Sequence, residues 1–261
     1  ITGGDLTIYL DNVGHYELTA SEAEDGITDE VYLSQVAPAL ASDLTKDIFE
    51  NALQYPGPLA KRALPKASPC ATFDGVNDYA TAIIDNTSLS TYSTWIYATN
   101  ADSPVAGRYT AGNGILLYVT SSGIVQVYIS SSGSATYQAA TTPIALNSWS
   151  HVSATWDGTT AKIYVNGVLV PSTTSGSLTG PSNPAVSFAI GAFDGGLAGR
   201  LAGRLADLRV FNRVLTPSEI ASIYAGNDIT TGLVAHWPCS EKSGKLLNDI
   251  SGNGNNALAT G

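Results

Sequence analysis

Methionine is absent from the sequence, cysteine occurs only twice, and Asp, Glu, Lys and Arg make up only 13% of the 261 residues. No apolar run approaches the roughly 18 residues that a membrane-spanning helix needs, so we expect no membrane insertion. The 12 basic residues are outnumbered by 22 acidic ones, which gives a net charge of −10. Such a chain has little with which to neutralise phosphate, and this argues against a nucleic-acid partner. Because the chain begins with Ile1 and lacks methionine, we expect a processed product.

Acidic residues are concentrated in the first quarter of the chain. Residues 1–66 contain eleven Asp and Glu against four Lys and Arg, whereas the remaining 195 residues contain eleven against eight. This shift indicates a domain boundary, with an acidic attachment region of mixed α/β structure at 1–66 and a second domain at 67–261. In the first region we expect a strand at Leu6–Leu10 and a helix at Asp43–Leu53, which Ser42 would cap.

The second domain has the pattern of an all-β sandwich, in which short apolar runs are separated by Gly, Ser and Asn. A hairpin is predicted at Ile115–Val119 and Ile124–Ile129, and a second one turns at Asn166-Gly167. A helix start is predicted at Thr216-Pro217-Ser218-Glu219, which combines a capping box with proline at the first helical position. We therefore expect antiparallel sheets and one short helix that ends near Tyr224.

The same domain contains a series of longer motifs. They are Phe73–Tyr79, Tyr92–Ile96, Trp149–Gly158, Lys162–Val170, Ile190–Gly191 and Leu205–Leu215. In this order, over about 190 residues, they resemble the laminin-G-like jelly-roll family of the concanavalin-A-like lectin/glucanase superfamily. The resemblance implies a concanavalin-A-like jelly-roll sandwich of two antiparallel sheets, and it does not extend to residues 1–66.

The end of the chain departs from the family's order. Gly232–Pro238 and Asp249–Asn255 resemble the segment that usually opens such a domain, but here they come last. The segment 229–261 therefore either closes the same sandwich in a permuted order or begins a further domain. We expect the first arrangement, with the opening-type strand beside the strand that carries Phe73.

The two cysteines flank these two elements, since Cys70 comes just before Phe73 and Cys239 comes just after Trp237. We predict a disulfide between Cys70 and Cys239, which fits an oxidising, extracellular setting. Two alternatives stay open. The cysteines could be buried free thiols, as in a reducing cytosol, or the C-terminal segment could be exchanged between subunits.

Because the superfamily includes glycosidases, an enzyme is the obvious rival interpretation. A retaining glycosidase needs two carboxyl groups roughly 5 Å apart, which on one strand requires acidic residues at i and i+2 or i+4. The acidic residues of the strand region instead stand alone, at Asp157, Asp194 and Asp207. We therefore predict no catalytic residues and no enzymatic activity. The scattered histidines, His15, His151 and His236, lie among apolar strand residues, and we expect them to be structural.

A loop near the C-terminus offers oxygen ligands for a metal. Asp249, Asn253 and Asn255 surround a glycine turn, and this is the kind of flexible oxygen set that Ca²⁺ accepts. Asp74 and Asp78 are further candidates for the same site. Asp, Asn and Gly also build ordinary turns through side-chain hydrogen bonds to the backbone. Two interpretations of this loop therefore stay open, a site for one structural Ca²⁺ and a metal-free turn.

Sugar binding needs exposed aromatic faces and planar polar groups. Candidates on the predicted strands and loops are Arg108, Tyr109, Asn113, Tyr118, Tyr128 and Tyr137. The alternative is that tyrosine simply suits a half-buried pleated surface. Ile115–Val119 is apolar on both alternating faces, whereas a strand that faces solvent alternates with polar residues. We expect its outer face to be covered by residues 1–66 or by a neighbouring subunit.

The resemblance implies a surface-exposed, non-enzymatic binding or structural module, because similar domains occur in phage fibre and capsid-decoration proteins and in secreted bacterial adhesins. We expect glycan binding or adhesion, with other subunits of an extracellular or virion assembly as partners. The expected location is extracellular, at the cell surface or on the virion. The alternatives are a purely structural decoration or fibre subunit without a ligand, and a glycoside hydrolase of the same superfamily.

Overall fold

The computed structural model describes two strands near the N-terminus and, with short gaps, residues 70–261. The gaps are residues 85–88, 100, 132, 134–135, 179, 181–185, 194–195, 197 and 242–244. The chain divides into two compact units, residues 1–59 and 60–261. The boundary after residue 59 lies slightly before the one after residue 66 that the change in charge predicted.

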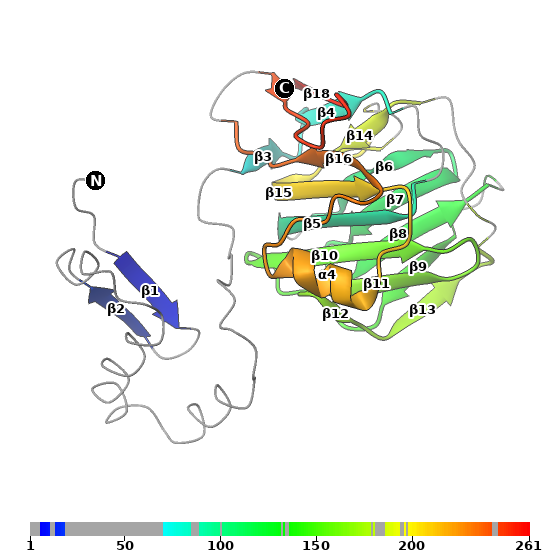
Figure 1. The fold of residues 1–261 in the computed structure, drawn as a ribbon. Coiled ribbons are helices and arrows are strands. Elements are labelled where there is room, and N and C mark those ends of the chain that lie inside the picture. The colour runs from blue at the N-terminus through cyan, green and yellow to red at the C-terminus, as the bar shows by residue number, and fades with distance from the viewer. Residues whose placement is uncertain are drawn as a thin grey trace. The chain divides into compact units, whose positions relative to one another are not determined.

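The two N-terminal strands, β1 (Leu6–Leu10) and β2 (Gly14–Leu18), form an antiparallel pair in which Leu6 lies opposite Leu18. The strand predicted at Leu6–Leu10 is therefore confirmed (Figure 1). The helix predicted at Asp43–Leu53 lies outside the described residues.

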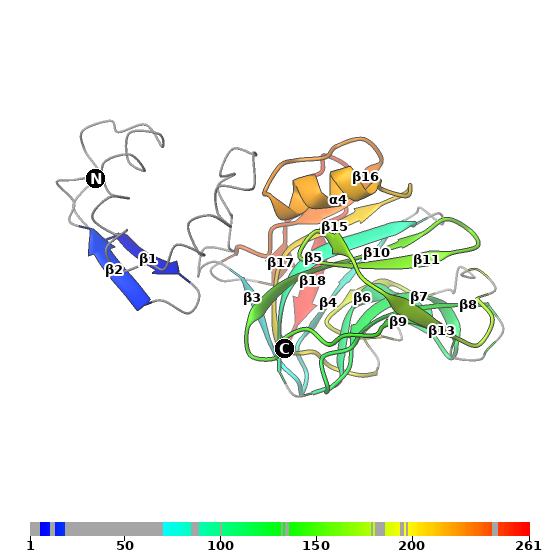
Figure 2. The ribbon, with the colours of Figure 1, turned by 90° about the horizontal axis from the view of Figure 1, so that it is seen from below.

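The second unit consists of two antiparallel sheets (Figures 1 and 2). In the seven-stranded sheet the order is β12-β11-β10-β5-β15-β16, and β3 also pairs with β15. The strands are β3 (Ala71–Asp74), β5 (Thr91–Ala98), β10 (Trp149–Trp156), β11 (Ala161–Val165), β12 (Val168–Leu169), β15 (Ala202–Phe211) and β16 (Leu233–Trp237). The predicted turn between β11 and β12 is confirmed, because Asn166 and Gly167 have the positive φ angles, 50° and 80°, that a two-residue hairpin turn requires.

The nine-stranded sheet follows the order β13-β9-β8-β7-β6-β14-β4-β18-β17. Its strands are β4 (Tyr79–Ala82), β6 (Ser103–Thr110), β7 (Asn113–Val119), β8 (Val125–Ser130), β9 (Tyr137–Ala140), β13 (Ser172–Ser175), β14 (Phe188–Ile190), β17 (Leu246–Leu247) and β18 (Ala257–Thr260). Strands β6 to β9 follow one another both in the chain and in the sheet. The predicted hairpin is confirmed as β7 and β8, in which Val119 lies opposite Val125.

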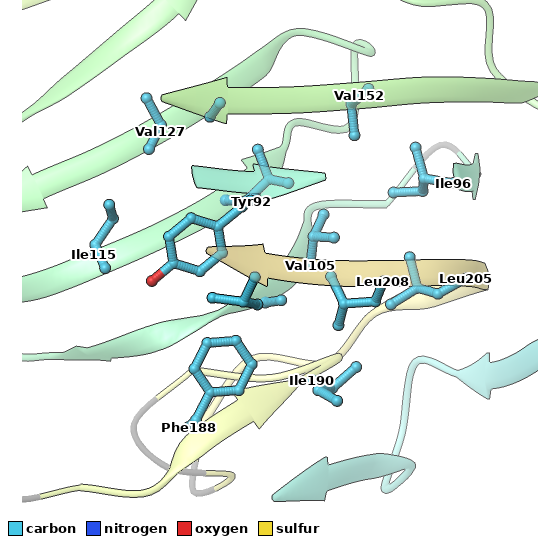
Figure 3. Close-up of a cluster of buried hydrophobic side chains, with 14 of the residues drawn as sticks. Tyr92, Ile96, Val105, Ile115, Val127, Val152, Phe188, Ile190, Leu205 and Leu208 are labelled. Carbon is cyan, nitrogen blue, oxygen red and sulfur yellow. The ribbon is translucent and has the colours of Figure 1, made fainter. Parts of the chain in front are cut away.

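The hydrophobic core lies between the two sheets, because successive residues of a strand point to opposite faces. Val127 belongs to the core from the nine-stranded sheet, and Ile96 and Val152 belong to it from the seven-stranded sheet (Figure 3). Tyr92 of β5 stacks on Phe188 of β14, with ring centroids 6.1 Å apart, so the two layers are in direct aromatic contact. Complete burial of an aliphatic or aromatic side chain contributes about 1.5–3 kcal/mol, which makes this interior the main source of stability.

Helix α4 (Pro217–Tyr224) lies on the side of the seven-stranded sheet that faces away from the other sheet (Figure 2). It begins as predicted, because the Thr216 hydroxyl accepts a hydrogen bond from the Glu219 N–H and the Glu219 carboxylate accepts one from the Thr216 N–H. Ile220 and Ile223 are buried in a small apolar cluster with residues of the sheet. Among the described residues, no helix is long and apolar enough to cross a membrane.

The C-terminal segment pairs with strands of its own unit, β16 with β15 and β18 with β4. The expectation that β16 lies beside β3 is wrong. Both strands occupy the same edge of β15, end to end, β3 against Ala202–Leu205 and β16 against Leu208–Phe211. The reason is length, since β15 has ten residues and β3 and β16 have only four and five.

Candidate functional site

Four tyrosines gather on the outer side of the nine-stranded sheet, on strands β6 to β9. The ring of Tyr128 is central, and its centroid lies 5.6 Å from the ring centroids of both Tyr109 and Tyr118. The Tyr137 ring is closer, at 5.0 Å. Because the neighbouring Val127 belongs to the core, strand alternation turns Tyr128 outward. We call the surface formed by Tyr109, Tyr118, Tyr128 and Tyr137 the tyrosine face.

Two more side chains occupy outward positions on the tyrosine face. Leu116 lies directly opposite Tyr128 and is 2% exposed, and Gln126 lies directly opposite Tyr118 and is 9% exposed. Within the part of the chain that the structure describes, the amide oxygen Oε1 of Gln126 is buried and has no hydrogen-bond partner. A buried acceptor without a partner costs about 1–3 kcal/mol. The tyrosine face therefore contains a buried acceptor whose hydrogen-bonding capacity no described group uses.

The burial of Leu116 explains how the strand Ile115–Val119 can be apolar on both faces. Residues directly opposite on an antiparallel pair have Cβ atoms about 4.5–5.5 Å apart, so the ring of Tyr128 lies within reach of Leu116. The cover on the outer face comes from tyrosines of the same sheet. Further cover by residues 1–66 or by a neighbouring subunit stays a prediction.

The charge beside the tyrosine face is negative. The Asp102 carboxylate accepts a hydrogen bond from the Ser121 N–H at 2.8 Å, at the end of the β6–β7 pair. Partial burial first, then the Asp102 carboxylate and the neighbouring Tyr128 hydroxyl, raises the pKa of Tyr118 to about 12. Burial first, then the neighbouring tyrosines and Asp102, also raises the pKa of Tyr128. Both hydroxyls are therefore protonated at neutral pH and can donate or accept hydrogen bonds.

Two of the predicted sugar-binding residues do not join the tyrosine face. Arg108 lies opposite Ile115, a core residue, so its side chain is on the inner side of the sheet, where it donates to the Ile84 carbonyl. Asn113 lies at the β6–β7 turn, and its amide nitrogen donates to the Ala111 carbonyl at 3.2 Å. The structure does not bring these two side chains together with the tyrosines, and a part for them in sugar binding stays a prediction.

Sequence reasoning missed Gln126 and Asp102. The position of Gln126 between Val125 and Val127 does indicate an outward-facing residue. Only the pairing register, however, places it opposite Tyr118. Asp102 precedes β6, and its proximity to the tyrosines depends on the hairpin that brings Ser121 to it.

The predicted calcium loop forms a dense network of its own hydrogen bonds. The Asp249 carboxylate accepts from the N–H groups of His236 and Asn255, and from both the N–H and the hydroxyl of Ser251, at 2.8–2.9 Å. Burial opposes ionisation of Asp249, but these hydrogen bonds outweigh it and lower the pKa of the carboxyl. Both carboxylate oxygens are therefore engaged within the loop.

The remaining candidate calcium ligands also take part in backbone hydrogen bonds. The amide nitrogens of Asn253 and Asn255 donate to the Val234 carbonyl at 3.0 and 2.8 Å. Asp74 accepts from three N–H groups of its own turn, and Asp78 accepts from the Asp74 N–H. No group of three or more His, Cys, Asp and Glu side chains in the described part of the chain could hold a metal ion. Calcium binding stays a prediction.

A serine–histidine pair lies in the seven-stranded sheet, closed off from solvent. The Ser93 hydroxyl oxygen lies 3.0 Å from Nε2 of His151, and both residues are 0% exposed. Trp95 and Tyr224 of α4 pack on the His151 ring, with centroids 5.3 and 5.7 Å away. Burial lowers the pKa of His151 to about 4. A substrate could reach this pair only by displacing α4, so the arrangement is structural.

Asp207, which stands alone in the sequence, is paired in the fold. It contacts Nε of Arg209 at 2.9 Å and Nε2 of His236 at 2.6 Å, and Arg209 also contacts Asp228 at 3.1 Å. Burial acts to raise the pKa of Asp207, but His236 and Arg209 prevail and lower it. A catalytic carboxylic acid needs a raised pKa. Every shift resolved for a described carboxyl group is downward.

Two antiparallel sheets that enclose one core define a β-sandwich of the jelly-roll type. The Laminin_G_3 model, of the concanavalin A-like lectin/glucanases superfamily, matches residues 74–221, and the chain belongs to this superfamily. The resemblance and the jelly-roll fold expected from the sequence are thereby confirmed. No curated protein sequence matches the chain.

Several solved structures have a similar fold. A candidate carbohydrate-binding protein from Bacteroides ovatus ATCC 8483 superposes with a TM-score of 0.58 at 21% identity, covering 74% of this chain and 58% of that one. The CBM40 domain of the Ruminococcus gnavus IT-sialidase gives a TM-score of 0.45 at 16% identity, covering 60% and 98%. A SAP-like pentraxin of Limulus polyphemus gives 0.44 at 18% identity, covering 60% and 82%. At these identities the likeness concerns the fold alone.

Proposed function

We propose that the protein is a non-enzymatic glycan-binding module and that the tyrosine face is its binding site. The observation that carries this proposal is the amide oxygen of Gln126. It is buried without a partner among the described residues, opposite Tyr118 and two residues from Tyr128. Ligand sites typically combine aromatic walls with a few convergent polar groups, and this is the combination found here.

A sugar has the two surfaces that the tyrosine face would recognise. Its C–H groups form an apolar patch that packs on tyrosine rings, and its hydroxyls can donate to Gln126 or pair with the tyrosine hydroxyls. The rings that surround Tyr128 are tilted by 50–79° relative to it. A ligand therefore meets rings in several orientations, which favours a three-dimensional sugar chain over a flat surface.

The chemistry of the polar clusters supports binding without turnover. Ser93 and His151 are buried beneath α4, and the Asp207 carboxyl is held ionised by Arg209 and His236. Glycoside hydrolysis needs one carboxyl group that stays protonated to act as the acid. Incubation with laminarin, carrageenan, agarose and mixed glucans should accordingly release no reducing ends.

We place this module in an extracellular or virion assembly, at a cell surface or on a particle, with other subunits as partners. The support for this setting is the resemblance to domains of phage fibre and decoration proteins and of secreted adhesins. Electron microscopy and light scattering of the purified chain test it, since a monomer with no tendency to assemble would contradict it.

A glycan array followed by calorimetric titration tests the binding proposal. Tyr128→Ala should weaken binding at least about tenfold, because Tyr128 is the ring that touches the other three. Tyr97→Ala is the matched control, since Tyr97 is a half-buried tyrosine of the other sheet whose ring lies 5.9 Å from that of Trp149. An array without reproducible hits would instead indicate a structural subunit without a ligand.

A further inference from the structure

The polar groups of the tyrosine face are uncharged, apart from one carboxylate at its edge. The outward positions of β6 to β9 are occupied by Pro104, Gly107, Tyr109, Gly114, Leu116, Tyr118, Gln126, Tyr128, Ser130, Tyr137 and Ala139. Within the described segments of these strands, no lysine or arginine holds an outward position. The strands' one basic residue, Arg108, is on the inner side of the sheet, opposite Ile115.

The carboxylate at the edge is that of Asp102. Its charge acts on the hydroxyls of both Tyr118 and Tyr128, where it opposes their ionisation. A second negative charge brought to these rings by a ligand would meet the same repulsion. Asp102 itself is fixed in place, because its carboxylate accepts from the Ser121 N–H at 2.8 Å.

Hydrogen-bonding capacity leads to the same conclusion. Oε1 of Gln126, which has no partner in the described segments, is an acceptor, and so is the Asp102 carboxylate. An ionised carboxylate or sulfate has acceptors only and cannot pair with either group. A sugar hydroxyl carries a proton that it can donate to either of them.

Resting on the glycan-binding function proposed above, we infer that the tyrosine face selects neutral glycans and discriminates against sialylated, uronate-containing or sulfated ones. Selection would follow from the Asp102 charge, from the Gln126 acceptor and from the lack of a described cation at the outward positions. The ligand class is therefore a neutral oligosaccharide whose hydroxyls donate at Gln126.

The test compares neutral oligosaccharides with their sialylated, sulfated and uronate-containing counterparts on one array, followed by titration of matched pairs such as lactose and sialyllactose. We expect the wild-type protein to prefer the neutral member of each pair by about fivefold or more, the factor that one like-charge contact at about 4 Å in water provides. Binding of the acidic members with equal or higher affinity would overturn the inference but leave the glycan-binding function standing. Binding of neither kind would overturn both.

One substitution isolates the charge. Asp102→Asn keeps an oxygen that accepts from the Ser121 N–H and removes only the negative charge. It should raise the affinity for acidic glycans about fivefold relative to neutral ones. Asp157→Asn is the matched control, because Asp157 also accepts backbone N–H groups of an exposed turn, those of Thr159 and Thr160, but lies next to β10 of the other sheet. An unchanged ratio in Asp102→Asn, or an equal change in Asp157→Asn, would refute the role of Asp102.

Discussion

Cys70 and Cys239 lie beside the same point of β15, although 168 residues separate them in the chain. Cys70 immediately precedes β3, which begins to pair at Leu205. Cys239 follows β16, and the carbonyl just before it accepts from the Asp207 N–H at 3.1 Å. Burial above all, with Glu241 and Cys70 among the nearby groups, raises the pKa of the Cys239 thiol. The end-to-end arrangement of β3 and β16 thus places the two cysteines near each other.

Both cysteines are free thiols in the structure, Cys239 buried and Cys70 half-buried. The disulfide stays a prediction, and we expect it to form in an oxidising medium because the fold already places the residues as neighbours. In the chain-entropy model a loop of this length stabilises the fold by about 4–5 kcal/mol. Cys70→Ala should lower the free energy of unfolding of the oxidised protein by an amount of that order.

Thiol counting and non-reducing electrophoresis distinguish the outcomes for the cysteines. The bond requires no free thiol in the denatured, unreduced monomer. Two free thiols would contradict it, and a covalent ladder would show that the C-terminal segment is exchanged between subunits. The reduced wild-type protein is the control, because it should melt like Cys70→Ala.

Local signals in the sequence were sufficient for the turns and the helix. Asn166-Gly167 and the capping box at Thr216 each determine their structure within a few residues, and both were predicted correctly. The arrangement in which β16 and β3 pair end to end with the same edge of β15 depends instead on contacts between distant segments. The approach of Ser93 to His151 depends on the register of β5 and β10 in the same way. Neither leaves a local trace in the sequence.

The candidate site was predicted only in part, and the reason is strand alternation. The structure brings together the four predicted tyrosines. Arg108 and Tyr109 are adjacent on one strand, so they point to opposite faces and cannot serve the same surface. Gln126 was missed because a glutamine between two valines indicates only an outward position. What makes it notable is that its buried oxygen has no partner among the described residues, and only the packed structure can show this.

The Asp249 loop should be a major local contributor to stability. Asp249→Ala removes four hydrogen bonds and leaves the N–H groups of His236, Ser251 and Asn255 without their acceptor. We expect a loss of about 2–4 kcal/mol, because unpaired donors at partly buried positions are costly. Chemical denaturation measures it, and Asp157→Ala at an exposed turn is the control, with a smaller expected effect.

The same loop provides the test for calcium. If it binds Ca²⁺ in its native form only, EDTA lowers the melting temperature and added Ca²⁺ restores it by mass action. Identical melting curves with and without chelator would rule out calcium binding. The hydrogen bonds of Asp249 would then account for the loop conformation without a metal.

His151 should make stability depend on pH in the mildly acidic range. Its folded pKa of about 4 lies below the ordinary 6.5, because burial disfavours the charged ring. The unfolded chain therefore binds a proton that the folded chain does not, and stability is lost as the pH falls from about 6.5 to about 4. Between pH 7 and pH 5 this single group should contribute a loss of about 2 kcal/mol.

The variant His151→Gln isolates this contribution. It cannot titrate, so the difference in unfolding free energy between pH 7 and pH 5 should shrink by about 2 kcal/mol. Ser153→Ala is the control, because Ser153 donates to Ser93 in the same polar cluster at 2.9 Å but has no charge to gain. An undiminished pH dependence in His151→Gln would show that other groups cause it.

Gln126 and Gln138 form a matched pair on neighbouring strands, and they should respond in opposite ways to the same substitution. They are 9% and 7% exposed. Both ends of the Gln138 amide are engaged, since its nitrogen donates to the Ser172 hydroxyl at 2.7 Å and its oxygen accepts from the Thr174 hydroxyl at 2.6 Å. The Gln126 oxygen has no partner in the described chain.

Methionine has nearly the shape of glutamine without its polar atoms. Gln126→Met should therefore raise the free energy of unfolding by about 1 kcal/mol, because it removes a buried acceptor that no described group satisfies. Gln138→Met should lower it by about 1–3 kcal/mol, because it leaves the Ser172 and Thr174 hydroxyls without their partner. Chemical denaturation of both variants measures the two changes.

The glycan affinities of the two variants should rank in the opposite order to their stabilities. Gln126→Met should weaken it about tenfold although the protein is more stable, because the ligand hydroxyl loses its buried acceptor. Gln138→Met should bind normally, since that side chain lies on the inner side of the sheet with its own partners. A Gln126→Met protein that is stabilised but binds glycans unchanged would show that the unpartnered oxygen has no part in the site. One that is destabilised would show that the amide is satisfied after all.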